Sequence, residues 1–260
     1  MRITVTNRPA NPDGPMKASA LEFRLRYFLH GLVYTLGFWA PWNYALHLDP
    51  PGPNSHTWGL LAATLSKAGL MNIGADFDLL LALGIAFAVG GALLRTWGSA
   101  YLGAGIVQDG SMHAGVVADG PYRHLRNPLY LGTFLHSFTL TLLMPPSGAI
   151  WTLVLIGVMQ IRLILGEEAF LESTLGAPYL AYCQLVPRLL PSLKTRIAAA
   201  GKPPAWGQAF LGELYMWGVA CSFAFAGWNY NARPLIKCVI ISLGLSLVAR
   251  AFIKGPKNRE

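Results

Sequence analysis

The stretch LLLALGIAFAVGGALLRTWGSAY, residues 79–101, decides the fold class of this chain. An α-helix needs a predominantly apolar run of about 20 residues to cross the hydrocarbon core of a bilayer, and this stretch meets that need. Only 12% of the residues in the chain are charged, whereas soluble domains carry roughly 25%. We therefore expect an all-α fold, a polytopic transmembrane helical bundle.

Further apolar blocks on both sides of this stretch approach the same length. They cover residues 27–47, 128–143, 149–165, 209–228 and 235–253. Residues 143–147 (LMPPS) allow only a tight turn, so the blocks on either side of them are expected to form a hairpin. Residues 58–70 form a shorter block that contains Ser66 and Lys67. We expect this block to be an interfacial or re-entrant helix.

Basic residues gather at the ends of the apolar blocks, in groups that precede the first and third blocks, follow the fourth and end the chain. All these groups can face the cytoplasm, where basic loops collect, only if residues 58–70 do not cross. We therefore predict six spans, with both termini and the chemical site on the cytoplasmic side of an inner or plasma membrane. The net charge of +8 lies at headgroup level, so we expect lipids and no nucleic acid as partners.

The composition divides the chain into three parts. Residues 1–22 are polar and contain several prolines, which predicts a weakly ordered tail. Residues 23–200 are expected to form the core of the protein. Residues 201–260 follow a linker with Pro203 and Pro204 and are expected to form a two-helix C-terminal extension. The three cysteines have no histidine partners at metal-ligand spacing, and we expect no metal site.

Two polar segments stand out as candidates for chemistry. The first is GPYRHLRNPLYLG, residues 120–132, and the second begins as GEEAFLE at residues 166–172 and continues to residue 191. One apolar block begins at Pro128 and the next ends near residue 165, so both segments should emerge on the same membrane face. This places Arg126, Asn127 and Tyr130 within reach of Glu167 and Glu168.

Each of these residues also has a purely structural explanation. Asn127 and Pro128 suit an ordinary helix start, in which Asn caps free N–H groups and Pro occupies the first turn. Neighbouring arginines could bind headgroup phosphates, and Glu167 with Glu168 could be a solvated pair at a helix end. Loop histidines such as His113 and His124 are more often structural than catalytic. The residue types alone therefore leave both explanations open.

Taken together, three patterns resemble the isoprenylcysteine carboxyl methyltransferase family. They are RNPLYLG at 126–132, the glutamate pair at 167–168, and YxxYxxxVPRLLP at 179–191. The family belongs to a wider membrane group that includes phospholipid N-methyltransferases. The resemblance covers residues 79–191, less than half of the chain. It implies an integral membrane methyltransferase that transfers a methyl group from S-adenosylmethionine to a lipid-like acceptor.

The resemblance also implies roles for individual residues. Those expected to line the cofactor pocket are Tyr122, Arg126, Asn127, Pro128, Tyr130, Gly132, Glu167 and Glu168. A glycine pair of the phospholipid branch is matched by Gly103 and Gly105, although glycines in a membrane helix often mark close packing instead. The expected catalytic residues are Arg126, Tyr130 and Glu168. The residues expected to contact the acceptor are Arg188 and Tyr182.

The substrate stays open at this point, because Asn127 replaces the histidine that the carboxyl methyltransferases usually carry. The phospholipid branch often has Asn-Pro here, whereas the ending VPRLLP points to the carboxyl branch. A carboxylate acceptor needs no general base, and no buried base is evident in the sequence, which favours carboxyl or thiol-like acceptors over amines. Two other classes remain as alternatives: an NADPH-dependent membrane oxidoreductase of the sterol reductase type, and a non-enzymatic scaffold.

Overall fold

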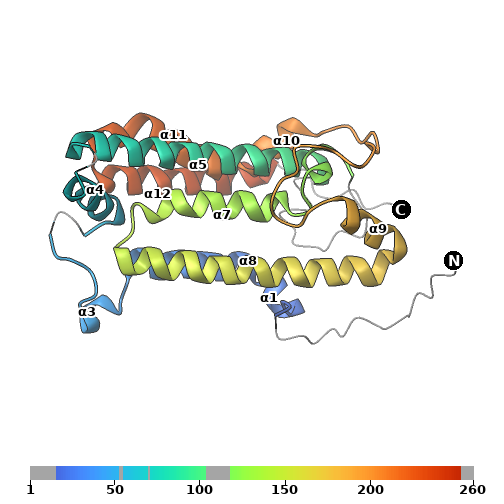
Figure 1. Ribbon diagram of the computed structural model, residues 1–260, viewed down its shortest axis with the longest axis horizontal. Helices are drawn as coiled ribbons and strands as arrows, with labels where there is room; N and C mark the ends of the chain where they lie inside the picture. The colour runs from blue at the N-terminus through green and yellow to red at the C-terminus, as the bar shows by residue number, and fades with distance from the viewer. Residues whose placement is uncertain (1–15, 53–54, 70, 104–117, 253–260) are drawn as a thin grey trace.

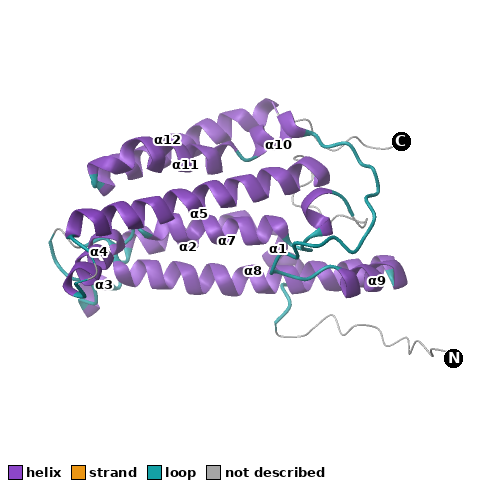
Figure 2. Cartoon of the chain, turned by 45° about the horizontal axis from the view of Figure 1, so that its top comes forward, coloured by secondary structure: helices purple, strands orange, loops and turns teal. Residues whose placement is uncertain are grey.

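The computed structural model describes residues 16–52, 55–69, 71–103 and 118–252, and all regular structure in these ranges is helical. The long helices run side by side along one axis (Figures 1 and 2). The prediction of an all-α bundle is therefore confirmed for this part of the chain.

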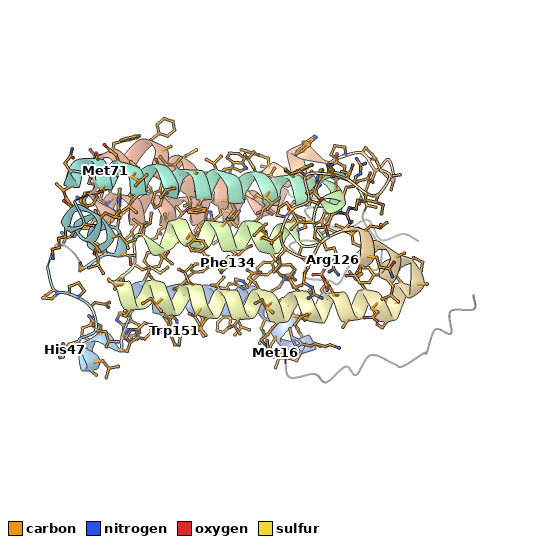
Figure 3. The ribbon with its side chains drawn as sticks, viewed as in Figure 1. Met16, His47, Met71, Arg126, Phe134 and Trp151 are labelled. Atoms are coloured by element: carbon orange, nitrogen blue, oxygen red, sulfur yellow. The ribbon has the colours of Figure 1, made fainter. Side chains whose placement is uncertain are left out.

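The long helices form a continuous series of packed neighbours. Helix α7 packs between α5 and α8, α2 packs on the other side of α8, and α11 packs on α5 with α12 beyond it. In chain order these helices are α2 (Arg26–Trp39), α5 (Ile73–Leu102), α7 (Pro128–Thr141), α8 (Pro146–Leu175), α11 (Leu214–Ala226) and α12 (Ala232–Ala249). Side chains fill the spaces between them, as where Phe134 of α7 lies over Gly157 of α8 (Figure 3).

Short helices close the ends of this series. The α-helices among them are α1 (Ala20–Arg24), α3 (Asn43–Leu46), α4 (Thr57–Lys67), α9 (Ala177–Leu185) and α10 (Trp206–Gly212). The 3-10 turns are η1 (Gly120–Arg123), η2 (Gly227–Asn229) and η3 (Arg250–Phe252). Helix α1 begins inside the stretch expected to be a tail, because Ser19 and Glu22 form a capping box.

Helix α4 is the segment expected to be interfacial or re-entrant. It has 11 residues, which make a helix of about 16 Å, too short for a bilayer core of about 30 Å. The backbone N–H groups of Thr57 and Trp58 donate to the carbonyl oxygens of Met144 and Leu142. The helix is thereby anchored to the hairpin turn between α7 and α8 and does not run through the bundle.

The predicted number of spans is only partly supported. Three described helices, α5, α8 and α12, are long and apolar enough to cross a membrane, and the bent pair α10–α11 would make a fourth. Helices α2 and α7 fall in the first and third predicted spans but have 14 residues each. Such helices are about 21 Å long, less than the thickness of the bilayer core. Six spans are therefore not confirmed.

Two predicted boundaries were wrong for identifiable reasons. The fourth block was expected to end near residue 165, but α8 continues to Leu175. Gly166 does not break the helix and instead packs against Ala18. The fifth block, 209–228, was expected to be continuous, but it bends by 67° at the break between α10 and α11. Glu213 occupies that break, and its contacts are described below.

The two candidate segments lie at the same end of the bundle, as predicted. Helices α5 and α8 end there and α2 and α7 begin there, whereas α4 and the hairpin turn lie at the opposite end (Figure 1). The labels in Figure 3 mark the same division, with Arg126 at one end and His47 and Met71 at the other.

Helices α2 and α8 cross at a backbone contact between two glycines. A Cβ atom built on Gly148 would fall on the carbonyl oxygen of Gly37 and 2.9 Å from its carbonyl carbon. Neither backbone can move without moving its helix, so the pair sets the separation of α2 from α8.

We predict that Gly148→Ala lowers the free energy of unfolding by about 1–3 kcal/mol, the usual cost of an overpacked contact. Thermal unfolding of the detergent-solubilised protein measures this. Gly31→Ala is the matched control, because a Cβ at this α2 position meets no atom within 4 Å. An equal effect of both substitutions would contradict the proposed crossing.

Candidate functional site

The two predicted polar segments are bonded to each other by their backbones. The N–H of Arg126 donates to the carbonyl oxygen of Pro187 at 2.9 Å, and the N–H of Ser192 donates to that of His124 at 2.9 Å. The Nδ1 atom of His124 lies 2.7 Å from the carbonyl oxygen of Ser192. Residues 186–192 therefore dock on residues 123–127, and the side chain of His124 takes part in the docking.

The side chain of Glu168 lies at the centre of a polar cluster that we call the Glu168 cluster, made of Arg126, Asn127, Glu168 and Arg188. Its Oε1 atom accepts from Asn127 Nδ2 at 3.1 Å and lies 3.2 Å from Arg126 Nη1. Its Oε2 atom accepts from Arg188 Nε at 2.9 Å and Nη2 at 2.8 Å. The hydrogen bond to Glu168 raises the pKa of Arg188. A buried carboxylate is thus held between two guanidinium groups and an amide.

Glu167 faces a different environment from its neighbour. Successive residues of an α-helix are about 100° apart around its axis, so the two side chains diverge. Glu167 accepts a hydrogen bond from the hydroxyl of Tyr130 at 2.9 Å. The two glutamates are therefore not a solvated pair at a helix end: both lie within α8 and bind different partners.

Two buried donors beside these glutamates have no hydrogen-bond partner among the described residues. They are the hydroxyl of Tyr122 and the Nε atom of Arg126. Burial, and then the charge of Glu167, raise the pKa of Tyr122 well above its ordinary value, so the hydroxyl keeps its proton. The hydroxyl of Tyr182, by contrast, has a hydrogen-bond partner: it donates to the carbonyl oxygen of Tyr122 at 2.7 Å.

The remaining predicted residues occupy structural positions. Pro128 begins α7 as its first residue. Gly132 faces α5, where an added Cβ would lie 2.9 Å from the carbonyl oxygen of Gly91. Gly103 ends α5 with φ of 111°, a conformation that favours glycine. Gly105 and His113 lie outside the described residues.

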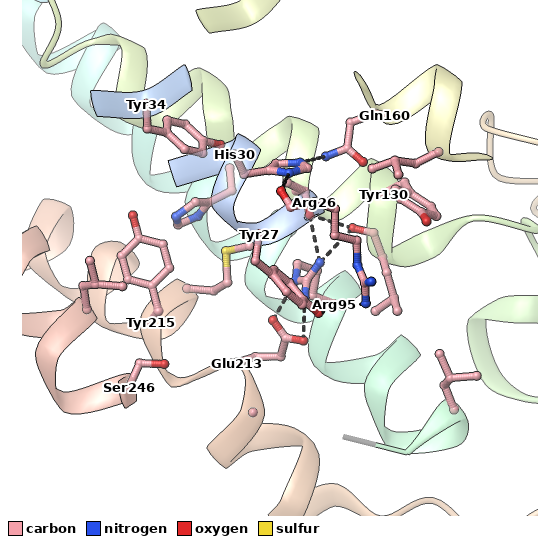
Figure 4. Close-up of a pocket in the computed structure, with 18 of the residues that line it drawn as sticks. Arg26, Tyr27, His30, Tyr34, Arg95, Tyr130, Gln160, Glu213, Tyr215 and Ser246 are labelled. Carbon is pink, nitrogen blue, oxygen red and sulfur yellow. Dashed lines mark hydrogen bonds and ion pairs between the residues drawn. The ribbon is translucent and has the colours of Figure 1, made fainter. Parts of the chain in front are cut away.

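A cavity of about 240 Å³ extends from Glu167 into the bundle (Figure 4). The polar side chains along it come from α2, α5, α7, α8, α11 and the α10–α11 break. They are Arg26, Tyr27, His30, Tyr34, Arg95, Tyr130, Thr133, His136, Gln160, Glu167, Glu213 and Tyr215, with Ser246 from α12. Sequence reasoning identified only Tyr130 and Glu167 of this set.

An ion pair between Arg95 and Glu213 crosses one side of the cavity (Figure 4). Nε of Arg95 lies 2.6 Å from Oε2 of Glu213, and Nη2 donates to Oε1 at 2.9 Å. Ser99 donates to the same carboxylate at 2.7 Å, and Thr133 accepts from Arg95 at 2.8 Å. A signal for this pair was present in the sequence, because an ionisable residue inside an apolar block is a functional candidate by default.

The site can be compared with known proteins through its central segment. Residues 79–177 match the phospholipid methyltransferase family. No curated protein and no solved structure matches the chain significantly. The family match supports a membrane methyltransferase that acts on a lipid and gives no support to the reductase alternative.

Two of the ion pairs at the site have only one partner inside the matched segment. Arg95, Tyr130, Glu167 and Glu168 lie within residues 79–177, whereas Arg188 and Glu213 lie beyond them. The later part of the chain therefore supplies counter-charges to the matched segment.

We predict that Glu213→Leu lowers the free energy of unfolding by about 3–5 kcal/mol, because it leaves the Arg95 guanidinium buried without its partner. The double variant Arg95→Met/Glu213→Leu should recover most of this loss, since no buried charge is then left unpaired. Thermal unfolding of the single and double variants measures both values. Glu172→Gln, at an exposed position of α8, is the control. Additive losses in the double variant would show that the pair is not coupled.

Proposed function

We propose that this protein is an integral membrane methyltransferase that uses S-adenosylmethionine to methylate a lipid-like acceptor. The observation that carries the proposal is the divergence of Glu167 and Glu168 inside a segment that matches the phospholipid methyltransferase family. Glu168 organises a polar cluster at one end of the bundle, and Glu167 lines a cavity that leads from there between the helices.

The residues present fit the proposed cofactor. S-adenosylmethionine carries a carboxylate, which needs donors, and an ammonium group and ribose hydroxyls, which need acceptors. The unpaired Tyr122 hydroxyl and Arg126 Nε are buried donors of the required kind. Glu167 and Glu168 are acceptors beside them, and Asn127 and Tyr130 hold these carboxylates in place. The cofactor supplies a methyl group already activated by its sulfonium.

The protein then has to position the reacting groups and exclude water, which together account for large rate effects. Arg126 and Asn127 are held by Glu168, and Tyr130 is held by Glu167, so their orientations are fixed before any ligand binds. The side chain of Arg188 is 47% exposed and is the member of the Glu168 cluster available to an anionic acceptor. Tyr182 supports the site through the backbone of Tyr122.

Two acceptor classes from the wider group fit this proposal. The isoprenylcysteine carboxyl class is supported by residues 179–191, which place Arg188 in the Glu168 cluster. The phospholipid class is supported by the family match. The site end also carries Arg24, Arg123, Lys194 and Lys202, and this basic composition supports an orientation with the site toward the cytoplasm.

The cofactor proposal predicts that S-adenosylhomocysteine stabilises the detergent-solubilised protein. At about 100 times its dissociation constant a ligand adds roughly 2.7 kcal/mol, which should raise Tm by about 5–10 °C in a chain of this size. Arg126→Ala and Glu168→Gln should abolish this rise with the helical content retained. Thermal unfolding with and without the ligand measures the effect.

The controls are close in sequence to the tested residues. The first control is Arg123→Ala. Arg123 lies three residues before Arg126, but its guanidinium donates to the carbonyl oxygen of Ile197, outside the Glu168 cluster. Glu172→Gln lies one helical turn beyond Glu168 on the exposed surface. Both controls should keep the full rise in Tm. No rise in the parent protein at millimolar ligand would overturn the proposed cofactor, and a full rise in both test variants would overturn the proposed site.

A further inference from the structure

The inner end of the cavity contains buried polar atoms that no described residue satisfies. These are Nδ1 and Nε2 of His136 on α7 and Oε1 of Gln160 on α8. Each buried polar atom left without a partner costs about 1–3 kcal/mol, and folded proteins pair nearly all of them. Their position around one cavity indicates that a bound molecule completes their hydrogen bonds.

The unpaired atom of Gln160 is an acceptor, because a chain of hydrogen bonds fixes its amide (Figure 4). The carbonyl oxygen of Arg26 can only accept, so Nδ1 of His30, 2.6 Å away, carries the proton. Nε2 of His30 is then an acceptor and receives a hydrogen bond from Nε2 of Gln160 at 3.1 Å. This contact uses the amide nitrogen of Gln160 and leaves its oxygen available in the cavity.

His136 supplies a second acceptor and one donor. Its side chain is 1% exposed, and its ring meets that of Tyr215 edge-on at 5.5 Å. A neutral imidazole has one N–H donor and one acceptor nitrogen. The inner end of the cavity therefore offers two acceptors and one donor to whatever enters it.

The cavity reaches the outer surface of the bundle. Tyr27 of α2 and Leu243 of α12 both line it and are 43% and 47% exposed. Helices α2 and α12 are the first and last in the series of packed helices, and both contribute to the lining of the cavity. A polar head group can enter between them while its hydrocarbon chains stay in the bilayer.

We propose that the inner end of this cavity binds the polar head of the methyl acceptor through Gln160 and His136, and that it selects head groups bearing N–H or O–H donors. A hydrocarbon chain satisfies none of the unpaired atoms, and a quaternary ammonium group has no N–H to donate. A protonated amine has three N–H donors and can satisfy both acceptors, whereas a single hydroxyl has one donor and satisfies one of them. This inference rests on the proposed function, because it identifies the bound lipid as the acceptor.

The test compares lipids with the same chains and different head-group donors. Dioleoylphosphatidylethanolamine and dioleoylphosphatidylcholine share their chains, phosphate and net charge, but only the first has N–H groups on its head. Native mass spectrometry of the full chain in detergent should show about ten-fold tighter binding of the ethanolamine lipid, as two hydrogen bonds imply. Dioleoylglycerol has a hydroxyl and no amine, so its binding shows whether an O–H donor can replace an N–H donor.

Two variants locate the selection. His136→Phe keeps an aromatic ring and removes both nitrogens, and Gln160→Met keeps a long unbranched side chain and removes the acceptor. Each should reduce the preference to about three-fold, the value expected when one of the two hydrogen bonds is lost. His56→Phe is the matched control, because His56 also has a buried unpaired nitrogen but lies near Trp58 and Phe77 at the other end of the bundle. It should keep the full preference.

The outcomes separate this inference from the proposed function. Equal binding of all three lipids would mean that solvent alone fills the cavity and would overturn the inference. An undiminished ten-fold preference in both variants would overturn it as well. The stabilisation by S-adenosylhomocysteine should persist in His136→Phe and Gln160→Met, because the Glu168 cluster is intact. Selective lipid binding without that stabilisation in the parent would instead overturn the methyltransferase and keep the head-group site.

Discussion

A charge buried between helices needs a counter-charge beside it. The buried guanidinium of Arg95 therefore requires the bundle to place a carboxylate next to it. Its guanidinium lies within the apolar stretch that identifies the fold, and its partner Glu213 comes 118 residues later. The carboxylate is carried at the break where α10 and α11 meet at 67°. The bent path sends α11 along α5 and brings α12 to the cavity. The C-terminal helices thus form one wall of the same cavity that the central segment lines.

The neighbouring glutamates of α8 connect the Glu168 cluster with the cavity. Because they diverge around the helix, Glu168 binds the docked segment 186–192 through Arg188, while Glu167 holds Tyr130 at the cavity. A shift of α8 would disturb both at once. The Gly37–Gly148 crossing, which sets the separation of α8 from α2, therefore acts on the geometry of the site as well as on the packing of the bundle.

The sequence was sufficient for the parts of the fold that depend on local pattern. The hairpin around residues 143–147, the helix start at Pro128 and the common end of the two polar segments follow from apolar length and proline position. The break at Glu213 and the pairing with Arg95 could not be located this way, because they depend on a contact between distant residues. His136 was missed for a related reason: it lies in an apolar block and has no local motif around it. A carboxyl acceptor was favoured because no buried base was evident, but His136 lies buried beside the cavity, so this preference no longer holds.

The division of the cavity among the helices bears on how the proposed acceptor is chosen. The segment that matches the methyltransferase family contributes Glu167, Glu168, Gln160 and His136. The rim and one wall come from α2, α11 and α12, which lie outside that segment. A family match over the central segment therefore bears on the transfer of a methyl group more than on the identity of the acceptor. The shape presented to the chains of a bound lipid depends on α2, α11 and α12, so changes in these helices alone can alter which lipid the cavity takes.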